Sequence, residues 1–125
     1  MKLARIVIAF AFAIGLTASA SLHAQINTVA GVPDCIQKGA QGQNTSWTNT
    51  CATPVTFQLF AFNTYLGYVV PAGNQVLQPG GIMLSDHLLT RFIYFVCPSG
   101  YAPGKSGTVG LAVDAQTTSY QCFPY

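Results

Sequence analysis

Acidic side chains are scarce in this sequence, and glutamate is absent. The 125 residues contain three aspartates, Asp34, Asp86 and Asp114, and long stretches of chain separate them. Glycoside hydrolysis needs two carboxylates side by side, and general acid–base catalysis needs titratable groups within hydrogen-bond reach. Because such groups are so few, we expect neither an enzyme nor catalytic residues.

One tripeptide, Ser85-Asp86-His87, contains the residue types of a hydrolase relay. Adjacent residues of a strand point to opposite faces, so we expect these three side chains not to act on one another. We interpret the tripeptide as a polar strand end followed by a loop.

Long apolar runs are limited to the N-terminus. Two positive residues begin the chain, an apolar run over residues 6–16 follows, and small residues come next. A membrane-spanning helix needs about 20 apolar residues, whereas this order of charge, apolar run and small residues is typical of a secretory signal peptide. We predict a signal peptide over residues 1–24, cleaved after Ala20 or Ala24, and one secreted or periplasmic domain over residues 25–125. An uncleaved anchor is the alternative.

Positive charge is sparse beyond the signal peptide. Lys38, Arg91 and Lys105 stand against the three aspartates, so three minus three leaves a formal charge of zero. A neutral surface cannot neutralise a row of phosphates, which argues against nucleic acid as a partner. With His87 as the one histidine after the predicted signal peptide and no Cys-x-x-Cys pair, we expect no metal site and no cofactor.

Four cysteines, Cys35, Cys51, Cys97 and Cys122, follow the signal peptide. An even number in an exported chain indicates two disulfides. A hairpin centred near Gln43 places Cys35 opposite Cys51, within disulfide reach, and leaves Cys97 to pair with Cys122. A Cys51–Cys97 bridge across two sheets, as in immunoglobulin-like sandwiches, is the alternative.

Short β-branched and aromatic runs alternate with turn residues throughout the mature chain. Such spacing is typical of an all-β sandwich or barrel. Pro79-Gly80 indicates a tight turn, because Pro presets φ and Gly allows positive φ. The run from Arg91 to Cys97 is apolar on both faces, so we expect it to be central in a sheet. Residues 84–90 can hold one helical turn. Strands are predicted at 32–37, 45–50, 54–62, 65–70, 74–78, 81–85, 91–97, 107–113 and 118–123.

Three short motifs carry a resemblance to a known class of proteins. They are Asn49-Thr50-Cys51-Ala52-Thr53-Pro54-Val55, Leu77-Gln78-Pro79-Gly80-Gly81 and Phe95-Val96-Cys97-Pro98. Over residues 45–98 the chain resembles small secreted bacterial cysteine-containing β-sandwich domains of unassigned function. The first two motifs are also similar to the opening of thaumatin-like proteins, which are about twice as long. The resemblance implies export and a β-sandwich, and it implies no activity.

Aromatic residues are the richest feature of the mature chain. Exposed Trp or Tyr on a β surface can stack on a sugar ring or anchor a protein interface. Residues 41–47 and 98–105 are the candidate contact loops, and the candidate binding residues are Trp47, Tyr101, Asn44 and Tyr68. The alternative for Trp47 is a core position beside a Cys35–Cys51 bridge.

Three hypotheses on function follow. The first is an exported binding or interaction domain whose aromatic and polar loops contact a glycan or an extracellular protein. The second is a structural or self-assembling component of the cell envelope, since edge strands on a neutral surface favour strand addition. Pro124, which interrupts the last strand, argues mildly against a pilin-like version. The third is an inhibitor of a hydrolase.

Overall fold

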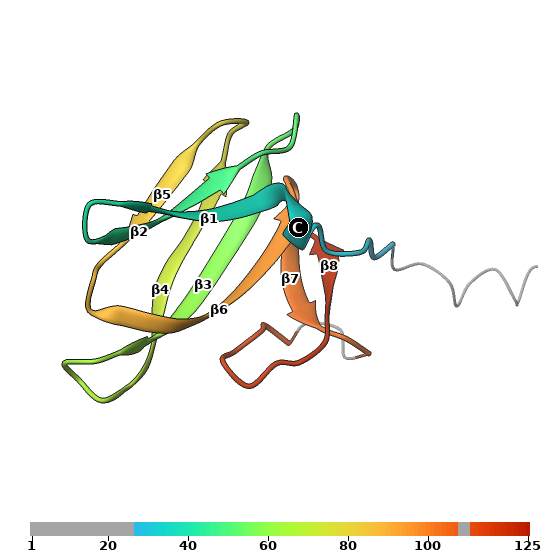
Figure 1. Cartoon of the computed structure of the whole chain (residues 1–125). Helices are drawn as coiled ribbons and strands as arrows, with labels where there is room; N and C mark the ends of the chain where they lie inside the picture. Colours follow the sequence, from blue (N-terminus) through green and yellow to red (C-terminus); the bar gives the residue numbers. More distant parts are fainter. Residues whose placement is uncertain (1–26, 108–110) are drawn as a thin grey trace, which may run out of the picture.

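A computed structural model describes residues 27–107 and 111–125 of the chain (Figure 1). The predicted signal peptide over residues 1–24 lies outside the described residues. The described part is almost entirely β structure. Its elements are η1 (Pro33–Cys35, a 3-10 turn), β1 (Ile36–Gln41), β2 (Asn44–Asn49), β3 (Val55–Asn63), β4 (Tyr68–Leu77), β5 (Ile82–Ser85), β6 (Leu89–Pro98), β7 (Tyr101–Lys105) and β8 (Tyr120–Pro124).

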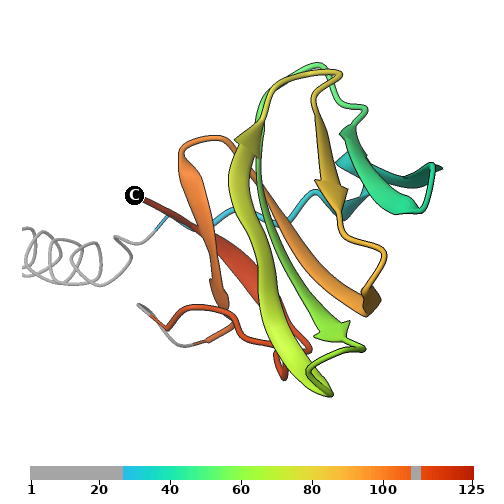
Figure 2. The same ribbon diagram turned by 90° about the vertical axis from the view of Figure 1, so that its left-hand side faces the viewer.

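The strands form three antiparallel sheets, ordered β1-β2-β5, β4-β3-β6 and β7-β8. Figure 2 shows them as layers, with β4-β3-β6 between the other two. The predicted all-β class is confirmed. None of the described residues belongs to a helix long and apolar enough to cross a membrane.

The larger core lies between the β1-β2-β5 sheet and the middle sheet. Alternate residues of β3, including Phe57 and Leu59, meet Trp47 and Met83 of the facing sheet there. On its other face the middle sheet contributes Phe60 and Phe95 to a smaller core with Val113. Strands covered on both faces are apolar on both faces, which accounts for the composition of β3 and β6.

The expectation that Arg91–Cys97 lies in the middle of a sheet was wrong in one respect. These residues belong to β6, which is apolar on both faces because two layers cover it. Yet β6 is an edge strand of its sheet, and β3 is the central strand. Burial by packed layers and position within a sheet leave the same pattern in the sequence, so periodicity could not separate them.

Both predicted disulfides are confirmed. Cys35 pairs with Cys51, with 5.0 Å between the Cα atoms, and Cys97 pairs with Cys122, with 5.6 Å between the Cα atoms. The predicted hairpin is present, with a two-residue turn between β1 and β2, but its register differs by one residue: Gln41 pairs with Asn44, and the N–H that bonds to the Cys35 carbonyl is that of Thr50. The Cys97–Cys122 bridge ties the middle sheet to β8, and the alternative Cys51–Cys97 bridge is not formed.

The first two motifs of the resemblance meet in one corner of the fold, and the third pairs with the first where Val55 lies opposite Pro98. The buried Asn49 amide donates to the carbonyl oxygens of Thr53 and Leu77, and its Oδ1 accepts from the N–H of Cys51. The Asn49 carbonyl also accepts from Gly80, which has a φ of +76°. The predicted Pro79-Gly80 turn is therefore confirmed. These motif residues have a structural role, because their hydrogen bonds join the end of β2 to the turn between β4 and β5.

Other expectations about elements were wrong, or fall partly outside the described residues. The strands predicted at 65–70 and 74–78 are one strand, β4, because the turn lies at residues 64–67. Residues 98–105, expected as a loop, contain β7, which pairs with β8 despite Pro103 and Gly104. Of the strand expected at 107–113, residues 108–110 lie outside the described part, and Gly104↔Ala112 is an isolated bridge.

Residues 84–90 hold the end of β5, a tight turn and the start of β6, without a helical turn. Pro124 does not interrupt β8. It is the last residue of that strand and pairs with Tyr101.

Candidate functional site

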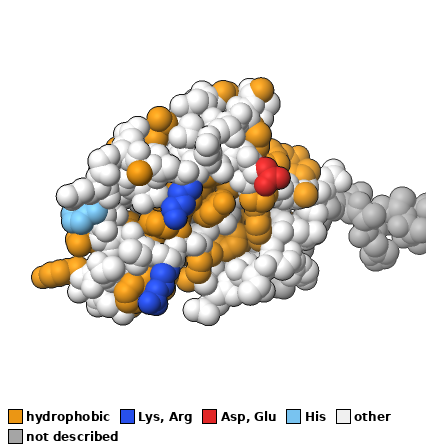
Figure 3. Space-filling view, viewed as in Figure 1, with side chains coloured by type: hydrophobic (Ala, Val, Ile, Leu, Met, Phe, Trp, Pro, Cys, Tyr) orange, Lys and Arg blue, Asp and Glu red, His pale blue; other side chains and the backbone are white. Residues whose placement is uncertain are grey.

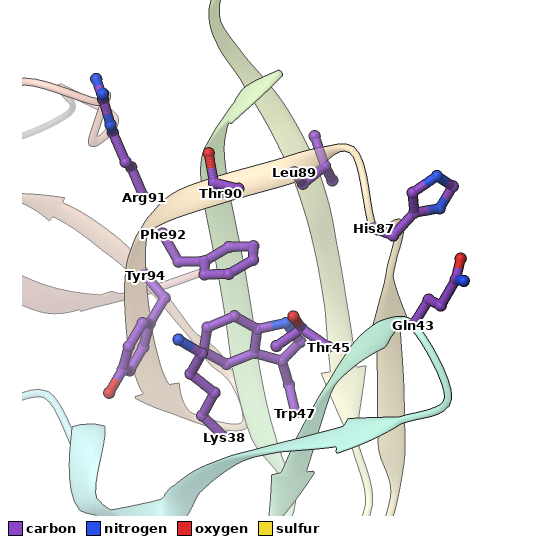
Figure 4. A pocket seen from close by; sticks show the side chains of 10 residues that line it. All are labelled: Lys38, Gln43, Thr45, Trp47, His87, Leu89, Thr90, Arg91, Phe92 and Tyr94. Carbon is purple, nitrogen blue, oxygen red and sulfur yellow. The ribbon is translucent and has the colours of Figure 1, made fainter. Parts of the chain in front are cut away.

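A groove of about 480 Å³ opens between the two sheets that enclose the larger core. On one side of this sandwich the Pro79-Gly80 turn joins β4 to β5. On the opposite side the β1 and β6 edges form the walls of the groove, with the β1–β2 turn and the β5–β6 turn at one end (Figure 4). A volume of this size falls within the range of about 300–1,000 Å³ that small-ligand sites occupy.

Aromatic rings from both sheets form the inner surface of the groove. The ring centroid of Trp47 lies 5.0 Å from that of Phe92 and 5.3 Å from that of Tyr94. Trp47 is 0% exposed, and Phe92 and Tyr94 are half-buried. The two half-buried rings therefore present the accessible aromatic surface, and Trp47 supports them from beneath.

Lys38 is the cationic side chain directed into the groove. Its position on β1 pairs with Trp47 on β2, so the sheet register places both residues on the inner face. The Nζ atom lies 5.0 Å from the centroid of the Phe92 ring, a cation–π distance. Within the described part of the chain, Lys38 makes no ion pair with a carboxylate.

Arg91 also lines the groove, and it sits at an irregularity of β6. Phe60 pairs with Ile93 and Phe62 pairs with Thr90, so an extra residue is accommodated between these pairs. Arg91 has a φ of +55°, a conformation that bulges usually assign to glycine. Its side chain turns away from the groove, and its guanidinium lies 5.0 Å from the Phe62 ring (Figure 4).

This backbone conformation stores strain at the groove wall. A non-glycine residue with positive φ costs on the order of 1–3 kcal/mol, and such residues cluster at functional sites. A bulge also changes which side chains face each side of a strand. Arginine has no preference for positive φ, so the sequence could not predict this backbone conformation of Arg91.

The Ser85-Asp86-His87 tripeptide does not form a relay. The Ser85 hydroxyl is buried and accepts a hydrogen bond of 3.0 Å from Trp47 Nε1. His87 Nδ1 and Asp86 Oδ1, however, lie 3.0 Å apart. The expectation that neighbours in this tripeptide cannot meet was therefore wrong for Asp86 and His87, because both follow the end of β5 and escape strand alternation.

The four predicted binding residues are not brought together. Trp47 is core, which confirms the alternative interpretation of that residue. Asn44 begins β2 outside the groove lining, Tyr68 begins β4 at the far end of the β3–β4 hairpin, and Tyr101 is half-buried in β7. Phe92 and Tyr94, which were not among the predicted binding residues, pack against the larger core and line the groove.

Two further cavities lie in the described part, and neither combines an aromatic ring with an unpaired charged group. One, of about 200 Å³ beside β7 and β8, is lined by apolar side chains and by Gly104. The other contains Lys105, whose ammonium is already paired with Asp114 at 2.9 Å. Hydrogen bonds from Lys105 and from the N–H of Gln116 lower the pKa of the Asp114 carboxyl below its usual value.

No group of three metal-binding side chains lies together in residues 27–107 and 111–125. Comparison of the chain with protein-family models, with curated proteins and with solved structures gave no match. Function therefore has to be argued from the groove itself.

Proposed function

We propose that this protein is an exported carbohydrate-binding domain whose binding site is the groove between β1 and β6. The observation that carries the proposal is the meeting of Phe92 and Tyr94 with Trp47 in one open groove. Sugar rings present C–H groups that pack well on aromatic faces, and a rigid ring loses little entropy on binding.

Polar groups complete the chemistry that a sugar needs. The Thr45 and Thr90 hydroxyls and the Gln43 amide also line the groove, and each can donate or accept a hydrogen bond. Ligand sites usually combine an apolar surface with a few convergent polar groups. Two disulfides fit an oxidising compartment, as an exported domain requires.

The proposal predicts a specific effect of Tyr94. The purified oxidised protein is titrated with cello-, chito- and galacto-oligosaccharides and with oligosaccharides that carry an acidic sugar, by calorimetry and by Trp47 fluorescence. We expect saturable binding to at least one oligosaccharide, and about a tenfold loss of affinity in Tyr94→Leu, which keeps apolar volume but removes the ring.

Tyr101→Leu is the matched control, because Tyr101 is also a half-buried strand tyrosine but lies in β7 outside the groove. Its affinity is expected to equal that of the unchanged protein. If no oligosaccharide binds, or if Tyr101→Leu loses affinity while Tyr94→Leu does not, the groove is not a carbohydrate site.

A second candidate function, assembly with further copies of the chain, is supported by the tip of the β3–β4 hairpin. Tyr65, Leu66 and Tyr68 are 83%, 47% and 58% exposed there. Asn63 Oδ1 accepts from the N–H groups of Tyr65 and Leu66, and Thr64 bonds to the Leu88 carbonyl. The backbone of the tip is therefore preorganised, and this reduces the entropy lost on association. The apolar side chains that it carries are exposed to solvent.

Sedimentation velocity over a range of concentrations tests this second candidate. If the tip mediates assembly, the Tyr65→Ser/Leu66→Ser variant stays monomeric at concentrations where the unchanged protein associates. Ile82→Ser is the control, because Ile82 is an exposed apolar residue on β5. A protein that is monomeric at every concentration contradicts assembly.

A further inference from the structure

The positive charge of Lys38 in the groove indicates which class of sugar the proposed binding site should prefer. Lys38 carries the ammonium that the groove presents, and its Nζ lies over the Phe92 ring. An ammonium has three N–H donors, and an aromatic face does not satisfy them as a carboxylate does. Among the described residues no aspartate lines the groove, and Asp86, the one beside its rim, contacts His87.

The fold fixes the backbone from which this ammonium extends, although the Lys38 side chain itself is exposed. Lys38 is anchored on β1 by six consecutive residue pairs with β2. The fully buried Trp47 ring lies on the paired position, where the aliphatic stem of a lysine can pack. A charge positioned before the ligand arrives gains more on binding than one on a freely moving side chain.

The arrangement of charge over the rest of the molecule supports selection by Lys38. Lys105 is neutralised by Asp114, and Arg91, which also lines the groove, turns its guanidinium toward Phe62. Figure 3 shows this face of the molecule, with a strip of hydrophobic side chains between the basic side chains near β1 and near β6. A neutral sugar on this strip would leave the Lys38 ammonium without a counter-charge.

We propose that the groove between β1 and β6 selects sugars that carry a carboxylate, and that Lys38 is the residue that recognises it. This inference rests on the proposed carbohydrate-binding function. The ring of the sugar packs on Phe92 and Tyr94, and the carboxylate accepts a charge-assisted hydrogen bond from Lys38 Nζ.

Pairs of sugars test the inference, because one member of each pair carries a carboxylate and the other does not. The probes are galacturonate oligomers against their methyl esters, sialyllactose against lactose, and N-acetylmuramic acid against N-acetylglucosamine. We expect the acidic member of at least one pair to bind about tenfold or more tightly, as one charge-assisted hydrogen bond allows. The preference should weaken as salt is added.

Lys38→Gln is expected to remove this preference, so that the acidic and the neutral member of a pair bind with equal affinity. Lys105→Gln lowers the net charge by the same amount at a distant site, so it should keep the preference, and Lys38→Arg should retain it as well. Equal binding of both members overturns the role of Lys38 while the carbohydrate function stands. Binding of neither member of any pair, nor of the neutral oligosaccharides, overturns both.

Discussion

The Trp47→Ala variant is expected to lose about 3–5 kcal/mol of the free energy of unfolding. Trp47 is 0% exposed and contacts rings from both strands that face it, Phe57 on β3 and Phe92 on β6. Truncation removes these contacts and leaves a cavity that the two sheets cannot close. Because small domains are stable by about 5–15 kcal/mol, this single change removes a large share of the total.

Urea unfolding followed by far-ultraviolet circular dichroism measures this loss, since the variant has no tryptophan to report by fluorescence. Trp47→Phe is the control, because it keeps an aromatic ring. It should lose only about 1–3 kcal/mol of the free energy of unfolding, because the ring is smaller and because the hydrogen bond from the indole N–H to the Ser85 hydroxyl is lost. An unchanged urea midpoint in Trp47→Ala would mean that Trp47 is not a core residue.

Removal of the Cys97–Cys122 bridge by the double variant Cys97→Ala/Cys122→Ala is expected to cost about 3–4 kcal/mol. The bridge closes a loop with a sequence separation of 25 residues, so it restricts the unfolded chain strongly. Its position adds a local effect, because it ties β6 of the middle sheet to β8 of the outer layer. The loss should therefore appear first as opening of β7 and β8.

Urea unfolding gives the size of this effect, and amide hydrogen exchange locates it. Exchange should accelerate in β7 and β8 while β2 and β3 stay protected. The Cys35→Ala/Cys51→Ala variant is the matched control. Its bridge spans a separation of 16 residues and has a smaller expected cost of about 3 kcal/mol, and it should leave β7 and β8 protected. Uniform acceleration in both variants would contradict the local role.

The candidate site was predictable only in part. A hairpin centred on Gln43 would pair Lys38 with Thr48, one residue away from the observed pairing of Lys38 with Trp47, so it would place Lys38 and Trp47 on opposite faces. The period of two along β6 does imply that Phe92 and Tyr94 share a face. Nothing in either segment says that these faces meet, because about fifty residues separate them along the chain. The positive φ of Arg91 was also beyond reach, since no local preference of arginine favours it.

By itself the sequence determined the features that depend on local chemistry and on chain distance. Alternating runs and turn residues indicated β structure, Pro79-Gly80 indicated a turn, and the spacing of four cysteines around one hairpin favoured the two disulfides that form over a Cys51–Cys97 bridge. Tertiary structure decided what depends on which layers meet. It buried Trp47 instead of exposing it, paired β7 with β8 where proline and glycine suggest a loop, and left the β1 and β6 edges apart, so that a groove opens between them. Local propensity is a property of neighbours in the chain, whereas a groove is a property of surfaces that only folding brings together.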